Sequence, residues 1–278
     1  MALAAGLAGC GNSLPRSVSG APTLQVATGV YPLGQIAGLI GQEKARSTDV
    51  VPGGADPLRY QLTPVQARQV RSAGLVLEVG GGFQPSFETA ASGARTVVKV
   101  RPAGPASPYV WLDPHTFNQA VGAIASAMEA ADPEAAPLFR RNASSLQAQV
   151  SSLDIAYSST LSACPDTTLI TPDRAFSSMA TSYSLQNIVV GAPSVASQVE
   201  AATQALAAGR TTSVITEPWV DNSGVTAVAA SANAKVHSLD TLVGPPSGGW
   251  PSGADYFSLM EQDLGTLSSI LGCPSPGQ

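Results

Sequence analysis

The stretch that decides the fold is DPEAAPLFRRNASSLQAQVSSLDIAYSSTLSA, residues 132–163. It contains no glycine, and its later proline, Pro137, falls near the first turn, where a helix tolerates proline. Apolar residues recur along it at helical spacing: Leu138, Phe139, Leu146, Val150, Leu153 and Tyr157. About 30 residues at a rise of 1.5 Å would span roughly 45 Å. We therefore predict one long helix, beginning at Asp132-Pro133, that acts as a spine.

Short apolar segments alternate with helical patterns on both sides of this spine. Before it, strands are expected at 24–28, 48–51, 75–79 and 96–100, with helices at 33–40 and 63–73. After it, strands are expected at 168–171, 187–190, 213–216 and 235–238, with helices at 175–183, 198–208, 224–232 and 255–271. Such alternation is typical of βαβ units and parallel sheets. We predict an α/β fold with two parallel-sheet lobes, residues 23–132 and 164–273, joined by one long backbone helix at 133–163.

Composition excludes several classes of protein. Of the 278 residues only 12% are charged, about half the usual share, and the formal net charge is −5. Because no basic patch or tail is present, nucleic-acid binding is not expected. No run of 18 apolar residues predicts a membrane-spanning helix. The chain also lacks the Gly-x-Ser-x-Gly and His-Glu-x-x-His motifs of hydrolases, so it is not expected to be an enzyme.

The N-terminus and the cysteines predict an exported protein. Residues 1–10, MALAAGLAGC, resemble a bacterial lipobox, in which Cys10 would be lipidated. The Gly-, Ser- and Pro-rich residues 11–22 are typical of a tether, so we exclude residues 1–22, a signal remnant and linker, from the fold. An exported chain permits disulfides, and Cys164 and Cys273 then form an even pair. We predict a disulfide between them, with two buried thiols as the alternative.

Acidic side chains follow three predicted strands of the second lobe. They are Asp173, Glu217 and Asp240. Ligands of open parallel sheets bind beyond the carboxyl ends of the strands. Unpaired carboxylates at that edge repel one another. A cation, either a metal ion or an arginine, is therefore expected beside them.

Several phrases resemble the cluster A-I substrate-binding proteins, the receptors of zinc and manganese ABC importers. They cover nearly the whole chain in order: YPLGQIAGLIGQ (31–42), VVPGGADPLRYQLTP (50–64), VWLDP (110–114), ITPDRAFSSMA (170–180), ITEPWV (215–220) and GADYFSLMEQDLGTL (253–267). The resemblance implies a long spine helix and a ligand held in the cleft between two lobes. It also implies an ABC permease and its ATPase as partners, and zinc or manganese as the transported ligand. We expect a monomer outside the cytoplasm, anchored to the cell membrane by lipid at Cys10.

The metal ligands of that family match poorly here. Its two first-lobe histidines correspond to Leu58 and Tyr109, and its third ligand, a His or Glu, to Asp173. Its fourth ligand, an Asp or Glu, is retained as Asp240. Because zinc sites are usually four-coordinate with nitrogen or sulfur among their donors, oxygens alone would suit manganese, magnesium or calcium better.

Two main interpretations follow. In the first, a divalent metal binds a relaxed site of Asp173 and Asp240, with Tyr109, His115 or Glu217. In the second, metal binding is lost, Arg59 or Arg174 neutralises the carboxylates, and another small molecule or a protein partner is bound. An enzyme is the weakest interpretation, because neither His115 nor His237 lies in a nucleophile motif.

Overall fold

The computed structural model describes residues 23–101 and 107–274, so Cys10 and the tether lie outside the described residues. The first lobe is built on a parallel sheet with the strand order β2-β1-β3-β4. Its strands are β1 (Leu24–Thr28), β2 (Ala45–Asp49), β3 (Leu75–Glu78) and β4 (Val97–Lys99). Its helices are α1 (Tyr31–Gly41), α2 (Pro64–Ser72) and α3 (Pro85–Ala91), and short 3-10 turns occupy Gln42–Lys44 and Val110–Leu112.

The second lobe repeats this layout after the spine. Strands β5 (Thr168–Thr171) and β6 (Gln186–Val189) pair in parallel, as do β7 (Ser213–Thr216) and β8 (Lys235–Ser238). The two pairs meet where β5 lies beside β7. The helices are α6 (Ser177–Ser182), α7 (Ala196–Ala207), α8 (Ser223–Ala232) and α9 (Tyr256–Ile270). The predicted α/β fold with parallel sheets in two lobes is confirmed.

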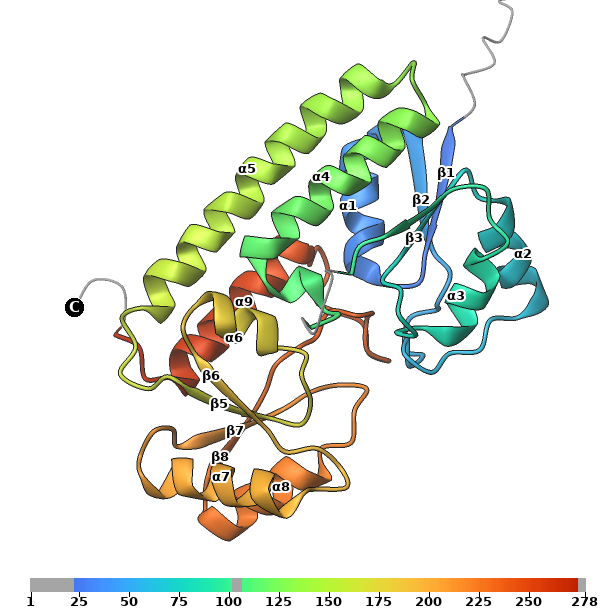
Figure 1. Cartoon of the computed structure of the whole chain (residues 1–278). Helices are drawn as coiled ribbons and strands as arrows, with labels where there is room; N and C mark the ends of the chain where they lie inside the picture. Colours follow the sequence, from blue (N-terminus) through green and yellow to red (C-terminus); the bar gives the residue numbers. More distant parts are fainter. Residues whose placement is uncertain (1–22, 102–106, 275–278) are drawn as a thin grey trace, which may run out of the picture.

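The spine is a pair of antiparallel helices, α4 (Pro114–Ala131) and α5 (Ala136–Leu161). They run side by side along the upper edge of Figure 1, and α9 packs against α5. The 26 residues of α5 span about 39 Å. The prediction that this helix begins at Asp132 was wrong, because residues 132–135 form the tight connection from α4. There the Asp132 carboxylate accepts a hydrogen bond from the N–H of Ala135 at 3.2 Å.

The central strands β3, β5 and β7 are buried on both faces, which explains why they read as largely apolar runs. Alternate residues point to opposite faces. In the first lobe, Val26 and Leu77 face the large core shared with the spine, whereas Val76 faces a smaller core beneath α2 and α3. In the second lobe, Leu169 faces the shared core, whereas Val214 faces the core beneath α7 and α8. The shared core therefore runs from one lobe through the spine into the other.

Two further expectations can be compared with the structure. The second strand was predicted at 48–51 but lies at 45–49, because its register is set by pairing with β1, from Leu24 opposite Ala45 to Thr28 opposite Asp49. The disulfide between Cys164 and Cys273 is confirmed, and it joins the end of α5 to the end of α9. Among the described residues, no helix combines the length and the apolar character that a membrane span requires.

Candidate metal site

Tyr109 of the first lobe meets two carboxylates that follow strands of the second lobe. The Tyr109 side chain is only 5% exposed and packs between Phe83 and Trp111, with ring centroids 5.0 and 5.6 Å away. Burial raises the pKa of the Tyr109 hydroxyl above its ordinary value, and the neighbouring carboxylates of Asp173, Glu217 and Asp56 raise it further. We call these four residues, Asp56, Tyr109, Asp173 and Glu217, the acidic cluster.

Glu217 is the most deeply buried member of the acidic cluster. It is 2% exposed, and neither of its carboxylate oxygens finds a hydrogen-bond donor within the part of the chain that the structure describes. Burial raises the pKa of this carboxyl well above its usual range, and the adjacent Asp173 raises it further. Because a buried carboxylate without partners is costly, Glu217 requires either a proton or a cation beside it.

The turn after β5 fixes Asp173 in this position. The Asp173 carboxylate accepts a hydrogen bond from the N–H of Ala175 at 2.6 Å, and the Thr171 hydroxyl donates to the Asp173 carbonyl at 2.7 Å. This local bonding needs only residues two apart, so Asp173 is held at the end of its strand independently of the other lobe. Two of the three predicted strand-end acids, Asp173 and Glu217, thus come together.

Asp240, the third strand-end acid, is engaged elsewhere. One of its carboxylate oxygens accepts from the N–H of Leu242 at 2.8 Å, and the other accepts from the indole N–H of Trp250 at 2.6 Å. The Asp240 backbone N–H donates to the buried carboxylate of Asp263 at 3.3 Å. Burial raises the pKa of Asp263 well above its usual range, and the charge of Asp240 adds to the rise.

Neither candidate arginine pairs with Asp173, Glu217 or Asp240 in the described chain. Arg59 is 81% exposed, and its nearest carboxylate is that of Asp56, 3.9 Å away. Arg174 is exposed and lines a separate pocket of about 400 Å³ together with Ser177 and Asn187. The ion pairs found among residues 23–101 and 107–274 do not join an arginine to Asp173, Glu217 or Asp240.

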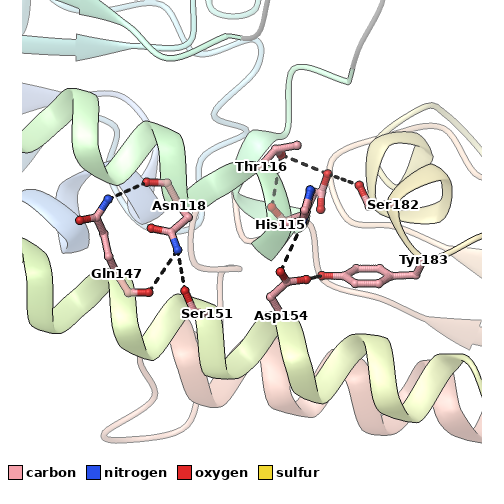
Figure 2. Close-up of polar contacts among 9 residues, drawn as sticks. His115, Thr116, Asn118, Gln147, Ser151, Asp154, Ser182 and Tyr183 are labelled. Carbon is pink, nitrogen blue, oxygen red and sulfur yellow. Dashed lines mark hydrogen bonds and ion pairs between the residues drawn. The ribbon is translucent and has the colours of Figure 1, made fainter.

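The other two candidate residues have structural roles. Leu58 packs against the shared core, and its N–H donates to Asp56 at 2.9 Å. His115, at the start of α4, is 67% exposed and lies 3.3 Å from the Asp154 carboxylate of α5. Figure 2 shows this contact, together with the hydrogen bond that the Tyr183 hydroxyl donates to Asp154 at 2.9 Å. His115 therefore belongs to the junction between the spine and α6.

The structure adds residues that the sequence did not single out. Asp56 joins the acidic cluster from the first lobe, so the negative charge of the cluster comes from both lobes. Its place in the Gly-Ala-Asp-Pro turn was the available signal. Trp250 and Asp263 carried no signal of their own. They lie 10 and 23 residues after Asp240 and reach it only because the chain folds back. Within the described residues, no three His, Cys, Asp or Glu side chains are grouped closely enough to hold a metal ion as they stand.

Comparison of the sequence with protein families gives one match over most of the chain. The family described as "ZnuA: Zinc-uptake complex component A periplasmic" matches residues 26–270. The high-affinity zinc uptake system protein ZnuA of Bacillus subtilis is 24% identical over 95% of this chain and 93% of its own length. A putative metal-binding protein of Chlamydia muridarum is 27% identical over 57% of this chain, and the match spans 62% of that protein.

Solved structures share the fold. A metal-dependent lipoprotein of Bacillus subtilis, YcdH, superposes with a TM-score of 0.77 at 20% identity, covering 90% of this chain and 100% of the other. The Zn(II)-bound ZnuA-like domain of Streptococcus pneumoniae AdcA gives a TM-score of 0.75 at 20% identity, covering 90% and 99%. A Cd-bound periplasmic metal-binding protein from Candidatus Liberibacter asiaticus gives 0.78 at 17% identity, covering 89% and 99%. At these identities the likeness concerns the fold.

Proposed function

Because the chain belongs to the ZnuA family of zinc-uptake complex components, we propose that it is the substrate-binding protein of an ABC importer for a divalent metal ion. This family consists of periplasmic transport components and is not an enzyme family. The transported ion would be held between the lobes, and a permease with its ATPase would receive it. Thermal unfolding in the presence of metal ions tests whether this site binds them.

The observation that carries this proposal is the buried carboxylate of Glu217 beside Asp173. Both oxygens of Glu217 lack donors in the described chain, and the pair has no arginine to neutralise it. A divalent cation between the two acids removes their repulsion and satisfies the unpartnered oxygens. The absence of such an ion pair also argues against the alternative, in which Arg59 or Arg174 fills the site and metal binding is lost.

We propose Asp173, Glu217 and the Tyr109 hydroxyl as the inner ligands, with Asp240 joining them. All four ligand atoms are oxygens. Leu58 and Tyr109 occupy the positions where the family that this sequence resembles has histidines. Carboxylate, hydroxyl and water oxygens suit Mn²⁺, Mg²⁺ or Ca²⁺ better than Zn²⁺, which is usually bound by nitrogen or sulfur donors. Manganese is therefore the proposed ion among the two that the family resemblance implies, with water completing its coordination.

The cellular setting is proposed on the same basis. Lipidation at Cys10 would anchor the protein to the outer face of the cytoplasmic membrane, where the Cys164–Cys273 disulfide is stable. The lobes would comprise residues 23–132 and 164–273, joined by the segment 133–163 that contains α5. A monomer is also proposed, as expected from the resemblance to substrate-binding proteins.

The test is a series of thermal unfolding measurements with Mn²⁺, Zn²⁺ and Ca²⁺ on the wild type and Glu217→Gln. An ion at 100 times its dissociation constant stabilises the native state by about 2.7 kcal/mol. We expect this stabilisation with Mn²⁺ in the wild type and its loss in Glu217→Gln, because an amide keeps the shape of the side chain but not its charge. The matched control is Glu200→Gln, at an exposed position of α7, which keeps the full Mn²⁺ response. Unchanged melting of the wild type with every ion contradicts the proposal.

A further inference from the structure

We propose that Trp250 restrains Asp240 and thereby limits the affinity of the cation site, so that the indole N–H must leave Asp240 before this carboxylate can bind the ion. This inference rests on the proposed function and concerns its regulation. It predicts that loss of one hydrogen-bond donor outside the acidic cluster strengthens metal binding.

Two N–H groups hold the carboxylate of Asp240. The Trp250 indole N–H lies 2.6 Å from one oxygen of the Asp240 carboxylate, and the backbone N–H of Leu242 lies 2.8 Å from the other. Hydrogen bonds to an ionised acceptor are short and about twice as strong as neutral ones. The bond to Leu242 is formed within a turn and costs little to keep. The bond to Trp250 is therefore the one that restrains the carboxylate from outside.

Trp250 is itself held in place by the first lobe. Its ring packs edge-on against Tyr31 of α1, with centroids 4.5 Å apart. The segment that leads to Trp250 is tied to the first lobe by two backbone hydrogen bonds. The Tyr31 N–H donates to the Val243 carbonyl at 3.0 Å, and the Gly54 N–H donates to the Pro245 carbonyl at 2.9 Å. A residue of the first lobe thus holds the indole that restrains an acid of the second.

Asp240 lies at the strand end next to the one that carries Glu217 of the acidic cluster. Strands β7 and β8 are neighbours, and the Leu239 N–H donates to the carbonyl of Thr216 at 3.1 Å. Asp240 and Glu217 directly follow these two bonded residues. Asp240 nevertheless does not form a metal-binding group of three with Glu217 and Asp173 in the described chain. Freeing its carboxylate supplies the third acid from the adjacent strand end.

The test is the affinity of Trp250→Phe for Mn²⁺, measured by calorimetric titration with manganese chloride. Phenylalanine keeps the aromatic contact with Tyr31 and removes only the N–H donor. Because a hydrogen bond to a charged group stabilises strongly, we expect Mn²⁺ to bind roughly tenfold more tightly. The double variant Trp250→Phe/Asp240→Asn should lose this gain, since the amide brings no charge to the ion.

The matched control is Tyr183→Phe, which also removes a donor from a carboxylate while keeping the ring. Its partner is Asp154 on the spine (Figure 2), so Mn²⁺ affinity should stay at the wild-type value. Tryptophan fluorescence gives a second readout. Mn²⁺ should change the emission of the wild type, and most of this change should be absent in Trp250→Phe if the indole moves away from Asp240.

The outcomes separate this inference from the proposed function. If the wild type binds Mn²⁺ and Trp250→Phe binds it equally, the restraint by Trp250 is refuted and the receptor proposal stands. A gain that survives Asp240→Asn also refutes it, because the gain then does not act through Asp240. If only Trp250→Phe binds Mn²⁺, the inference is supported in its strongest form. If neither protein binds any of the three ions, both proposals fail.

Discussion

At the scale of single residues, several acids outside the acidic cluster are also shielded from solvent. Asp49 is the last residue of β2 and lines a pocket of about 410 Å³ together with Tyr31 and Leu39. Burial raises the pKa of the Asp49 carboxyl from 3.8 to about 7, although the N–H of Val51 donates to it at 3.1 Å and lowers the pKa somewhat. The folded chain therefore keeps this proton at pH values where the unfolded chain loses it.

This pKa shift predicts a pH-dependent contribution to stability. The unfolded aspartate titrates near pH 4, so the contribution of Asp49 is present below pH 4, declines as the pH rises to about 7, and is lost above it. Asp49→Asn should raise the free energy of unfolding at pH 8 by about 2 kcal/mol, discounted for the partial exposure of the side chain. At pH 4 the variant should match the wild type.

Denaturant titrations at pH 4, 6 and 8 check this prediction. The control is Glu43→Gln, at an exposed position of the 3-10 turn before β2, whose stability should follow the wild-type pH profile. Equal stabilisation of Asp49→Asn at pH 4 and pH 8 would show that its effect does not come from the shifted pKa.

At the scale of elements, the spine is stabilised by what packs against it. The buried face of α5 includes Phe139, Val150 and Tyr157, and the Tyr157 hydroxyl donates to the Met260 carbonyl of α9 at 2.8 Å. The Cys164–Cys273 bridge then joins the ends of these two helices, which are separated by 109 residues in sequence. Such a long closed loop restricts the unfolded chain strongly.

Removing this bridge should therefore destabilise the protein without changing its fold. We expect Cys164→Ser/Cys273→Ser to lose about 2–4 kcal/mol of unfolding free energy, the usual contribution of a native disulfide. Thermal melting with and without dithiothreitol measures the effect. The wild type should become less stable on reduction, whereas the double variant should not respond. A reductant-sensitive double variant would assign the effect to something other than this bridge.

At the scale of the whole molecule, the lobes are continuous with each other. The shared core contains Leu33 of the first lobe, Phe139 of the spine and Leu239 of the second lobe. Buried hydrogen bonds also cross between the lobes: the Trp111 indole donates to the Thr241 carbonyl at 2.8 Å, and the Tyr256 hydroxyl donates to the Trp111 carbonyl at 2.7 Å. Separating the lobes would expose this core and break these bonds together.

We therefore predict that the chain unfolds as one cooperative unit despite its two sheets. Differential scanning calorimetry should show a single transition, with a calorimetric enthalpy equal to the van't Hoff enthalpy. Two resolved transitions, or a calorimetric enthalpy well above the van't Hoff value, would mean that each lobe has an independent core.

Much of the architecture is a local property of the sequence. The strands Thr168–Thr171 and Ser213–Thr216 and the long helix after Pro137 follow from apolar periodicity, because burial against neighbours requires that spacing along the chain itself. Helix α4 (Pro114–Ala131), which lies beside α5, was not among the helices predicted from apolar periodicity. The acids at the strand ends could be identified for the same local reason, since strand and turn boundaries are written in adjacent residues.

Which of those acids meet is not a local property. Tyr109 reaches Asp173 across the lobe boundary, while the chain folds back within 10 residues to bring Trp250 onto Asp240. The arginines that the sequence offered as neutralising partners lie elsewhere, Arg59 beside Asp56 and Arg174 in a separate pocket. Charge and hydrogen-bonding capacity are determined by the sequence, but the distances that decide how they act are set by strand order and by loops that close over many residues. Only the tertiary structure decides those distances.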